Sequence, residues 1–176
     1  LDLDRTLLNT SLVFNIFQNV LYDRGYEYSE KLNGARKELE TTGGSFDVFG
    51  FIMSQLSSQQ FKETIDAFRK KSQEADLLNE GAHEFLAYLN DNGIDFGIFT
   101  YGTLEWQQEK IRVSGLDNVP AIIIPNKGKG ELIGTWYQRE TNMFNVPTAF
   151  GAGTYRHLTL IDDKAVEFLG LPHEAT

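Results

Sequence analysis

Two carboxylates stand one residue apart at the start of the sequence, Asp2 and Asp4 in the stretch DLDRT. Because side chains alternate along an extended segment, residues 2 and 4 would point the same way. One such carboxylate can attack as a nucleophile while the other moves protons. An isolated acidic pair is more often a solvated surface turn. The pair therefore indicates chemistry only if partners arrive from elsewhere in the chain.

The elements that could bring partners are four short apolar or β-rich runs, predicted as strands. They cover residues 1–3, 94–100, 121–124 and 158–161, and they alternate with helical patterns. Such alternation predicts an α/β fold with a doubly wound parallel sheet, in which ligands bind beyond the carboxyl ends of the strands. The residues expected at those ends are Asp2, Asp4, Thr100, Tyr101, Gly102, Thr103, Lys127, Lys129, Asp162 and Asp163.

Helical spacing dominates the segment between the first two predicted strands. Residues 11–25 read as an amphipathic helix with Asn9 or Thr10 as its cap. Residues 29–40, 46–56 and 57–73 also favour helix. The sequence thus predicts a helical block from residue 11 to about 79, broken near residues 41–45.

Two more helices are expected beyond that block. One covers residues 81–93 with Gly93 as its stop, and the other covers residues 103–116. The stretch from Thr141 to Tyr155 is rich in Gly, Asn, Pro and Thr, and it is predicted to be an irregular loop.

Composition limits the classes of function. The 176 residues fit one domain, or a compact core with a modest insertion, and there is no cysteine for disulfides or thiolate chemistry. Twenty-five acids against 16 bases give a net charge of −9, which disfavours nucleic acid or an anionic membrane as a partner. Without an apolar run of spanning length or a signal peptide, a cytoplasmic protein is expected.

Both ends of the sequence raise expectations about its extent. The first residue is Leu and already belongs to a predicted strand, so residues upstream are expected to be missing. Only 13 residues follow Asp163, so either the sheet is smaller than usual or the C-terminus is incomplete.

The ordered motifs resemble the haloacid dehalogenase superfamily. Its pattern runs Asp-x-Asp-x-Thr, then a Thr or Ser ending a strand, then a Lys, then a pair of Asp. Here these pieces read DLDRT, GIFT ending at Thr100, KGKG and LIDDK, and they span nearly the whole chain in the family's order. Each piece alone would be an unremarkable turn, strand end or loop, whereas four in order support the resemblance.

The resemblance implies a phosphatase with a small helical cap of the C1 type. Residues 1–10 and 80–176 would form a Rossmann-like core, and residues 11–79 would form the cap inserted after the first strand. The expected reaction is Mg²⁺-dependent hydrolysis of a small phosphorylated metabolite. The oligomeric state is left open.

The resemblance also implies roles at the catalytic positions. Asp2 would attack phosphorus and form an aspartyl phosphate, and Asp4 would act as acid and then as base. Thr100 with the amides of Tyr101 and Gly102, together with a lysine, would hold the phosphoryl oxygens. Mg²⁺ would be held by Asp2, the backbone carbonyl of Asp4 and Asp162, with Asp163 as a ligand or a supporting partner.

Two positions carry open questions. The lysine could be Lys127 or Lys129, and Lys129 is favoured because KGELIGTW resembles the family's Lys-Gly followed by a helix. Arg5 stands where many relatives have Gly, so its side chain must point away from the phosphate or help to bind an anion.

Other functions remain as alternatives. A phosphotransferase or mutase would use the same residues, and a non-catalytic binding protein could retain the fold and the Mg²⁺ site. A dehalogenase has no obvious need for Asp4. A receiver domain has its acidic pair and phosphorylated Asp in a different order and lacks a helical insertion of this size.

Overall fold

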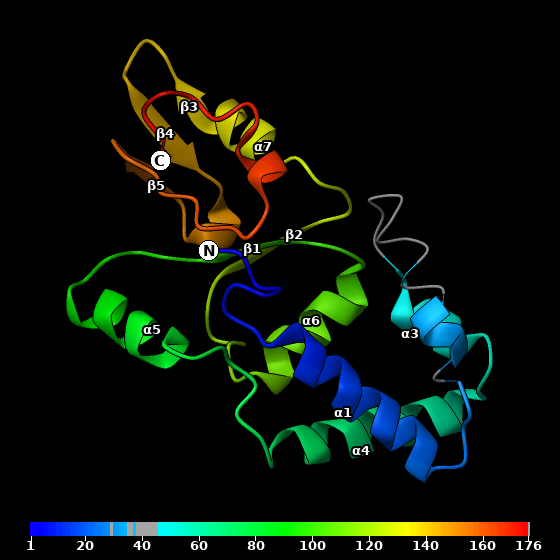
Figure 1. The fold of residues 1–176 in the computed structure, drawn as a ribbon. Coiled ribbons are helices and arrows are strands. Elements are labelled where there is room, and N and C mark those ends of the chain that lie inside the picture. The colour runs from blue at the N-terminus through cyan, green and yellow to red at the C-terminus, as the bar shows by residue number, and fades with distance from the viewer. Residues whose placement is uncertain (29, 35–36, 38–45, 176) are drawn as a thin grey trace.

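The computed structural model describes residues 1–28, 30–34, 37 and 46–175, and it is a mixed α/β structure (Figure 1). Its longer helices are α1 (Thr10–Asp23), α3 (Val48–Met53), α4 (Ser58–Ser72), α5 (Ala82–Asp91), α6 (Leu104–Val113) and α7 (Lys129–Trp136). Its strands are β1 (Ile98–Tyr101), β2 (Ala121–Ile124), β3 (Tyr137–Gln138), β4 (Met143–Val146) and β5 (Gly153–Tyr155). Two 3₁₀ helices, η1 (Thr148–Phe150) and η2 (Ala165–Phe168), complete the set.

A parallel pair of strands lies at the centre of the fold. Strands β1 and β2 pair in the register Ile98 with Ala121 through Tyr101 with Ile124. The start of the chain runs beside β1, because the Phe99 N–H donates to the Leu1 carbonyl at 2.7 Å. These segments therefore bring the N-terminal carboxylates to the carboxyl end of β1.

The outer predicted strands are not regular strands. The Asp2 N–H donates to the Ile161 carbonyl at 2.8 Å, and this one backbone hydrogen bond joins the start of the chain to the segment 158–161. After this hydrogen bond Leu3 enters a tight loop in which its carbonyl accepts the Leu8 N–H at 2.8 Å. Leu158 makes only an isolated bridge to Ala175. The predictions of strands over 1–3 and 158–161 are corrected, because these segments form only isolated backbone contacts and no continuous ladder with a neighbour.

The predicted irregular loop over residues 141–155 is wrong. Strands β3, β4 and β5 form an antiparallel sheet there, with Phe144 opposite both Tyr137 and Tyr155. Phe144 and Val146 are buried while Asn145 between them is exposed, which is the alternation of a strand with one covered face. The polar residues of this stretch belong to the turns and to the exposed face.

The helical block forms largely as predicted. Asn9 is the cap of α1, since its side chain accepts the Leu12 N–H at 3.1 Å. Helices α3 and α4 follow, and α4 starts with a capping box between Ser57 and Gln60. Of the helix expected over residues 29–40, only 30–34 and 37 are described, and these are helical; the expected break at 41–45 lies outside the described residues.

The chain enters and leaves the helical block side by side. The Asn9 N–H donates to the Leu77 carbonyl at 2.9 Å, and the Asn79 N–H donates to the Leu7 carbonyl at 2.8 Å. Leu8 and Leu78 form an antiparallel bridge between these bonds. The two connections therefore hold each other next to the loop that carries Asp4.

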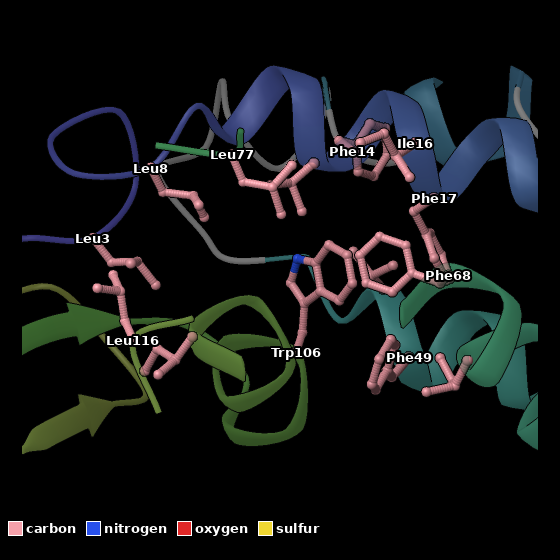
Figure 2. Close-up of a cluster of buried hydrophobic side chains, with 14 of the residues drawn as sticks. Leu3, Leu8, Phe14, Ile16, Phe17, Phe49, Phe68, Leu77, Trp106 and Leu116 are labelled. Atoms are coloured by element: carbon pink, nitrogen blue, oxygen red, sulfur yellow. The ribbon is translucent and has the colours of Figure 1, made fainter. Parts of the chain in front are cut away.

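Helix α6 packs against the helical block through aromatic rings. Trp106 lies with its ring centroid 5.2 Å from Phe49, 5.3 Å from Phe17 and 5.9 Å from Phe68, and Figure 2 shows this group between α1, α4 and α6. Arg69 of α4 also forms two hydrogen bonds with Glu109 of α6, at 2.7 and 2.8 Å. The orientation of α6 is thus fixed from the block side.

Candidate functional site

Asp2, Lys129 and Asp162 meet in the interior. The Lys129 Nζ lies 2.5 Å from Asp2 Oδ1 and 2.5 Å from Asp162 Oδ2. The second oxygen of Asp2 accepts a hydrogen bond from the Thr6 hydroxyl at 3.1 Å. Residues separated by most of the sequence thus surround one carboxylate.

Burial and charge act in opposite directions on Asp2. Desolvation raises the pKa of the Asp2 carboxyl, and the ammonium group of Lys129 opposes that rise. Lys129 is itself fully buried, so its charge is balanced by Asp2 and Asp162 rather than by solvent. A buried carboxylate whose ionised form is supported by a neighbouring cation can act as a nucleophile.

Three carboxylates form a candidate metal centre. Asp2, Asp162 and Asp163 can each offer an oxygen, and these oxygens lie within 4.8 Å of one another. The Lys164 N–H donates to Asp162 Oδ1 at 2.9 Å, which fixes the turn after residue 161. An all-oxygen donor set that is rich in carboxylate suits Mg²⁺.

The Asp4 carboxylate has a separate set of partners. The Lys110 Nζ lies 2.5 Å from both of its oxygens, Gln107 Nε2 donates to Oδ2 at 3.0 Å, and the Thr10 hydroxyl donates to Oδ1 at 2.9 Å. Desolvation would raise the pKa of Asp4, but the charge of Lys110 and these hydrogen bonds outweigh it and lower the pKa to about 2. Asp4 is ionised at neutral pH in this arrangement.

Thr100 ends β1 at the same edge. Its side chain is 1% exposed, and its hydroxyl has no hydrogen-bond partner within the described part of the chain. A buried hydroxyl without a partner is costly unless a ligand completes it. The Gly102 N–H, by contrast, is already used by the Ile124 carbonyl at 2.9 Å. Thr100 is therefore the better candidate contact for an anion.

The two candidate lysines lie in different environments. Lys127 is exposed, whereas Lys129 is the first residue of α7 and reaches Asp2. The carboxylate of Glu167, also fully buried, accepts the N–H groups of Gly128 and Lys129, each at 3.0 Å. Glu167 thus caps α7 from a distant segment and orients Lys129.

Lys164 brings another cation to the site and was not predicted. Its Nζ donates to the Tyr101 hydroxyl at 2.8 Å and lies 4.5 Å from the centre of that ring. Asp163 lies 4.0 Å away. The motif LIDDK contained this lysine, but nothing in its spacing linked it to Tyr101.

Arg5 has a backbone conformation that is unusual for a residue with a side chain. Its φ angle is +67°, in the left-handed region where Gly is unstrained. The Arg5 N–H donates to the Leu8 carbonyl at 3.0 Å, which keeps the loop closed. Glycine would adopt this backbone conformation without strain.

The sequence that carries much of this site matches a known hydrolase family. Residues 1–128 match the model of the haloacid dehalogenase-like hydrolase family, which is well over half of the 176 residues. The chain therefore belongs to this family, and membership indicates a hydrolytic enzyme. The matched range contains Asp2, Asp4 and Thr100, while Lys129 and Asp162 follow it.

No curated protein matches the chain. Across the described ranges, none of the helices has both the length and the apolarity that crossing a bilayer requires.

Proposed function

We propose that the protein is a Mg²⁺-dependent phosphomonoester hydrolase that acts on a small phosphorylated metabolite through an aspartyl phosphate on Asp2. The observation that carries the proposal is the Asp2 carboxylate, which is buried beside Lys129 and lies close to Asp162 and Asp163. A nucleophile, a fixed cation and a cluster of oxygen donors are the parts that phosphoryl transfer to a carboxylate needs.

The first step is attack of an Asp2 oxygen on phosphorus. A bond forms between that oxygen and phosphorus, the bond from phosphorus to the ester oxygen breaks, and the leaving alkoxide takes up a proton. The Thr6 hydroxyl, bonded to the other Asp2 oxygen, orients the carboxylate for this attack. Lys129 offsets the negative charge that would otherwise repel the phosphate.

The second step is hydrolysis of the aspartyl phosphate. Water attacks phosphorus, the bond from phosphorus to the Asp2 oxygen breaks, and a carboxylate takes the proton of the water. Asp4 is assigned this role as base, because its partners favour the ionised form. As the acid of the first step, Asp4 gives the leaving alkoxide a proton that it has taken from solvent or from the attacking water of the preceding turnover.

The phosphoryl group would lie at the end of β1. The unpaired hydroxyl of Thr100 is aimed at no group of the described chain, and the ammonium groups of Lys129 and Lys164 flank the same edge. Tyr101 contributes through its contact with Lys164. Donors placed where charge develops lower the barrier without further reorganisation.

The donor set fits Mg²⁺, and Asp2, Asp162, Asp163 and the backbone carbonyl of Asp4 would hold it. When bound, the ion supplies charge neutralisation between the carboxylates and the phosphate.

The domain division is part of the proposal. Residues 1–10 and 80–176 would form a Rossmann-like, doubly wound core, with residues 11–79 as a C1-type cap that selects small substrates. The paired connections at Leu7–Asn9 and Leu77–Asn79 support a boundary there. The absence of nucleic-acid or membrane partners is proposed on the acidic charge balance. A cytoplasmic setting is also part of the proposal.

The test is turnover of a panel of phosphate esters, including an aryl phosphate, with Mg²⁺ or with a chelator. The wild-type protein should release phosphate only with Mg²⁺, and Asp2→Asn should lose activity by at least about a thousandfold, the order of effect of removing a covalent nucleophile. Asp117→Asn, at an exposed site, is the matched control. Product analysis separates hydrolysis from transfer to a second alcohol.

Two results would count against the proposal. A wild-type protein that turns over no ester in the panel overturns the assigned reaction. Equal rates for wild type and Asp2→Asn remove Asp2 as the nucleophile.

A further inference from the structure

Helix α6 presents two buried polar side chains to Asp4. Gln107 and Lys110 are three residues apart, so they lie on one face of the helix. Each is only 3% exposed, and together they reach both Asp4 oxygens, from Lys110 at 2.5 Å and from Gln107 at 3.0 Å. Burying the ammonium group of a lysine costs free energy unless a charged partner lies within hydrogen-bond distance, and Asp4 is that partner.

The surroundings of Gln107 show that this contact is built into the fold. Its Nε2 also donates to the Tyr101 carbonyl at 2.7 Å, which links the end of β1 to Asp4. Gly102 makes room for it, because a Cβ there would lie 2.5 Å from the same nitrogen. The φ of Gly102, +148°, also favours glycine.

The helical block holds α6 beside these two side chains, since Trp106 lies one turn before Lys110 on the same side of the helix. Trp106 packs among the block's aromatic rings, and Glu109 is bonded to Arg69. Because these contacts fix the backbone of α6, Gln107 and Lys110 do not move with Asp4 if its carboxylate turns away. They define one position for that carboxylate.

We propose that Lys110 and Gln107 are positioning residues that hold the Asp4 carboxylate where it accepts the proton of the water attacking phospho-Asp2. The inference rests on the proposed function. In that step the oxygen of water bonds to phosphorus, the bond from phosphorus to Asp2 breaks, and the proton moves to Asp4. Lys110 and Gln107 act through Asp4 and take no part in bond making.

The inference predicts a specific kinetic change. Nitrophenolate leaves phosphorus without needing a proton, so formation of phospho-Asp2 from nitrophenyl phosphate does not depend on Asp4. Lys110→Met should therefore leave kcat/KM within about threefold of wild type. Its kcat should fall at least about tenfold, a fraction of what a positioned base contributes. KM should fall in parallel, and acid quench should trap a phosphorylated enzyme after a burst of nitrophenolate.

The variants are chosen to separate positioning from folding. Arg112→Met lies on the same helix with its side chain 60% exposed, and it should leave all constants unchanged. Gln107→Met removes the amide and leaves the Lys110–Asp4 ion pair in place. It should show the same burst, with lowered kcat and KM, but a smaller loss in kcat. If Lys110→Met does not fold, Gln107→Met carries the test.

The outcomes are distinct. A burst with lowered kcat and KM supports the inference. A fall in kcat/KM without a burst in a folded variant overturns it and leaves the proposed function standing. A wild-type protein without phosphatase activity removes the proposed function itself.

Discussion

The Glu167 carboxylate accepts the backbone N–H of Lys129 at 3.0 Å, although 38 residues separate them in sequence. The same oxygen accepts the Gly128 N–H, so one buried carboxylate occupies the N-terminus of α7. A negative charge there interacts favourably with the helix dipole and with its free N–H groups. Lys129, whose side chain reaches Asp2, is therefore held in place by a residue of η2.

Replacing Glu167 tests this relationship. Glu167→Gln keeps an acceptor but removes the charge, and it should lower the free energy of unfolding by about 1–2 kcal/mol, as loss of a strong helix cap does. Chemical denaturation measures this. Glu105→Gln, at an exposed position in the first turn of α6, should cost less than about 0.5 kcal/mol. Equal losses in the two variants would contradict the capping role.

Lys129 and Lys127 should differ sharply. Lys129→Met leaves Asp2 and Asp162 buried without their cation. In the presence of a chelator, this change should lower the free energy of unfolding by about 3–5 kcal/mol. Added Mg²⁺ should restore part of that loss by occupying the same carboxylates. Lys127→Met, at an exposed site, should change stability by less than about 0.5 kcal/mol. Thermal unfolding with and without Mg²⁺ provides the measurement, and similar behaviour of both variants would exclude the buried pairing.

The positive φ of Arg5 predicts a difference between two truncations. Arg5→Gly and Arg5→Ala both remove the side chain, but only Gly relieves the left-handed backbone at +67°. Arg5→Gly should therefore be more stable than Arg5→Ala by about 1 kcal/mol. Chemical denaturation tests this through the midpoints of the two variants, provided that their unfolding free energies depend equally steeply on denaturant concentration. If Ala is as stable as Gly, the loop does not hold residue 5 in that conformation.

Asp4 should make stability depend on acid pH. Its pKa is lowered in the folded state to about 2 from an ordinary value of 3.8, so its contribution is fully present above pH 4. It is lost as pH falls from about 4 to 2, and it amounts to about 2 kcal/mol. Asp2, whose pKa is raised by burial, shifts stability the other way.

A comparison with Asp4→Asn isolates that contribution, because Asp2 is common to both proteins. The difference in unfolding free energy between wild type and Asp4→Asn should shrink by about 2 kcal/mol between pH 5 and pH 2, measured in chelator. A constant difference over that range would mean that Lys110 does not stabilise the ionised carboxylate.

Local pattern accounts for what could be predicted. The periodicity of residues 11–25, the cap at Asn9 and the run AIII each depend on neighbours in sequence, and α1 and β2 form where they were expected. The order of the four motifs DLDRT, GIFT, KGKG and LIDDK along the chain was also sufficient to indicate the family that the comparison shows. Such local patterns predict the folded structure because backbone geometry fixes the helical and strand periodicities of the side chains.

The rest depended on contacts between distant segments. Lys110 reaches Asp4 across 106 residues, and Glu167 reaches Lys129 across 38, so neither spacing has a local signature. The antiparallel sheet around Phe144 was missed for the same reason, because its buried face is covered only after the chain has folded. The sequence by itself determined the helical block and which residue types could do chemistry. Only the tertiary structure decided which lysine reaches Asp2 and what holds Asp4, because burial and charge pairing are properties of the packed interior.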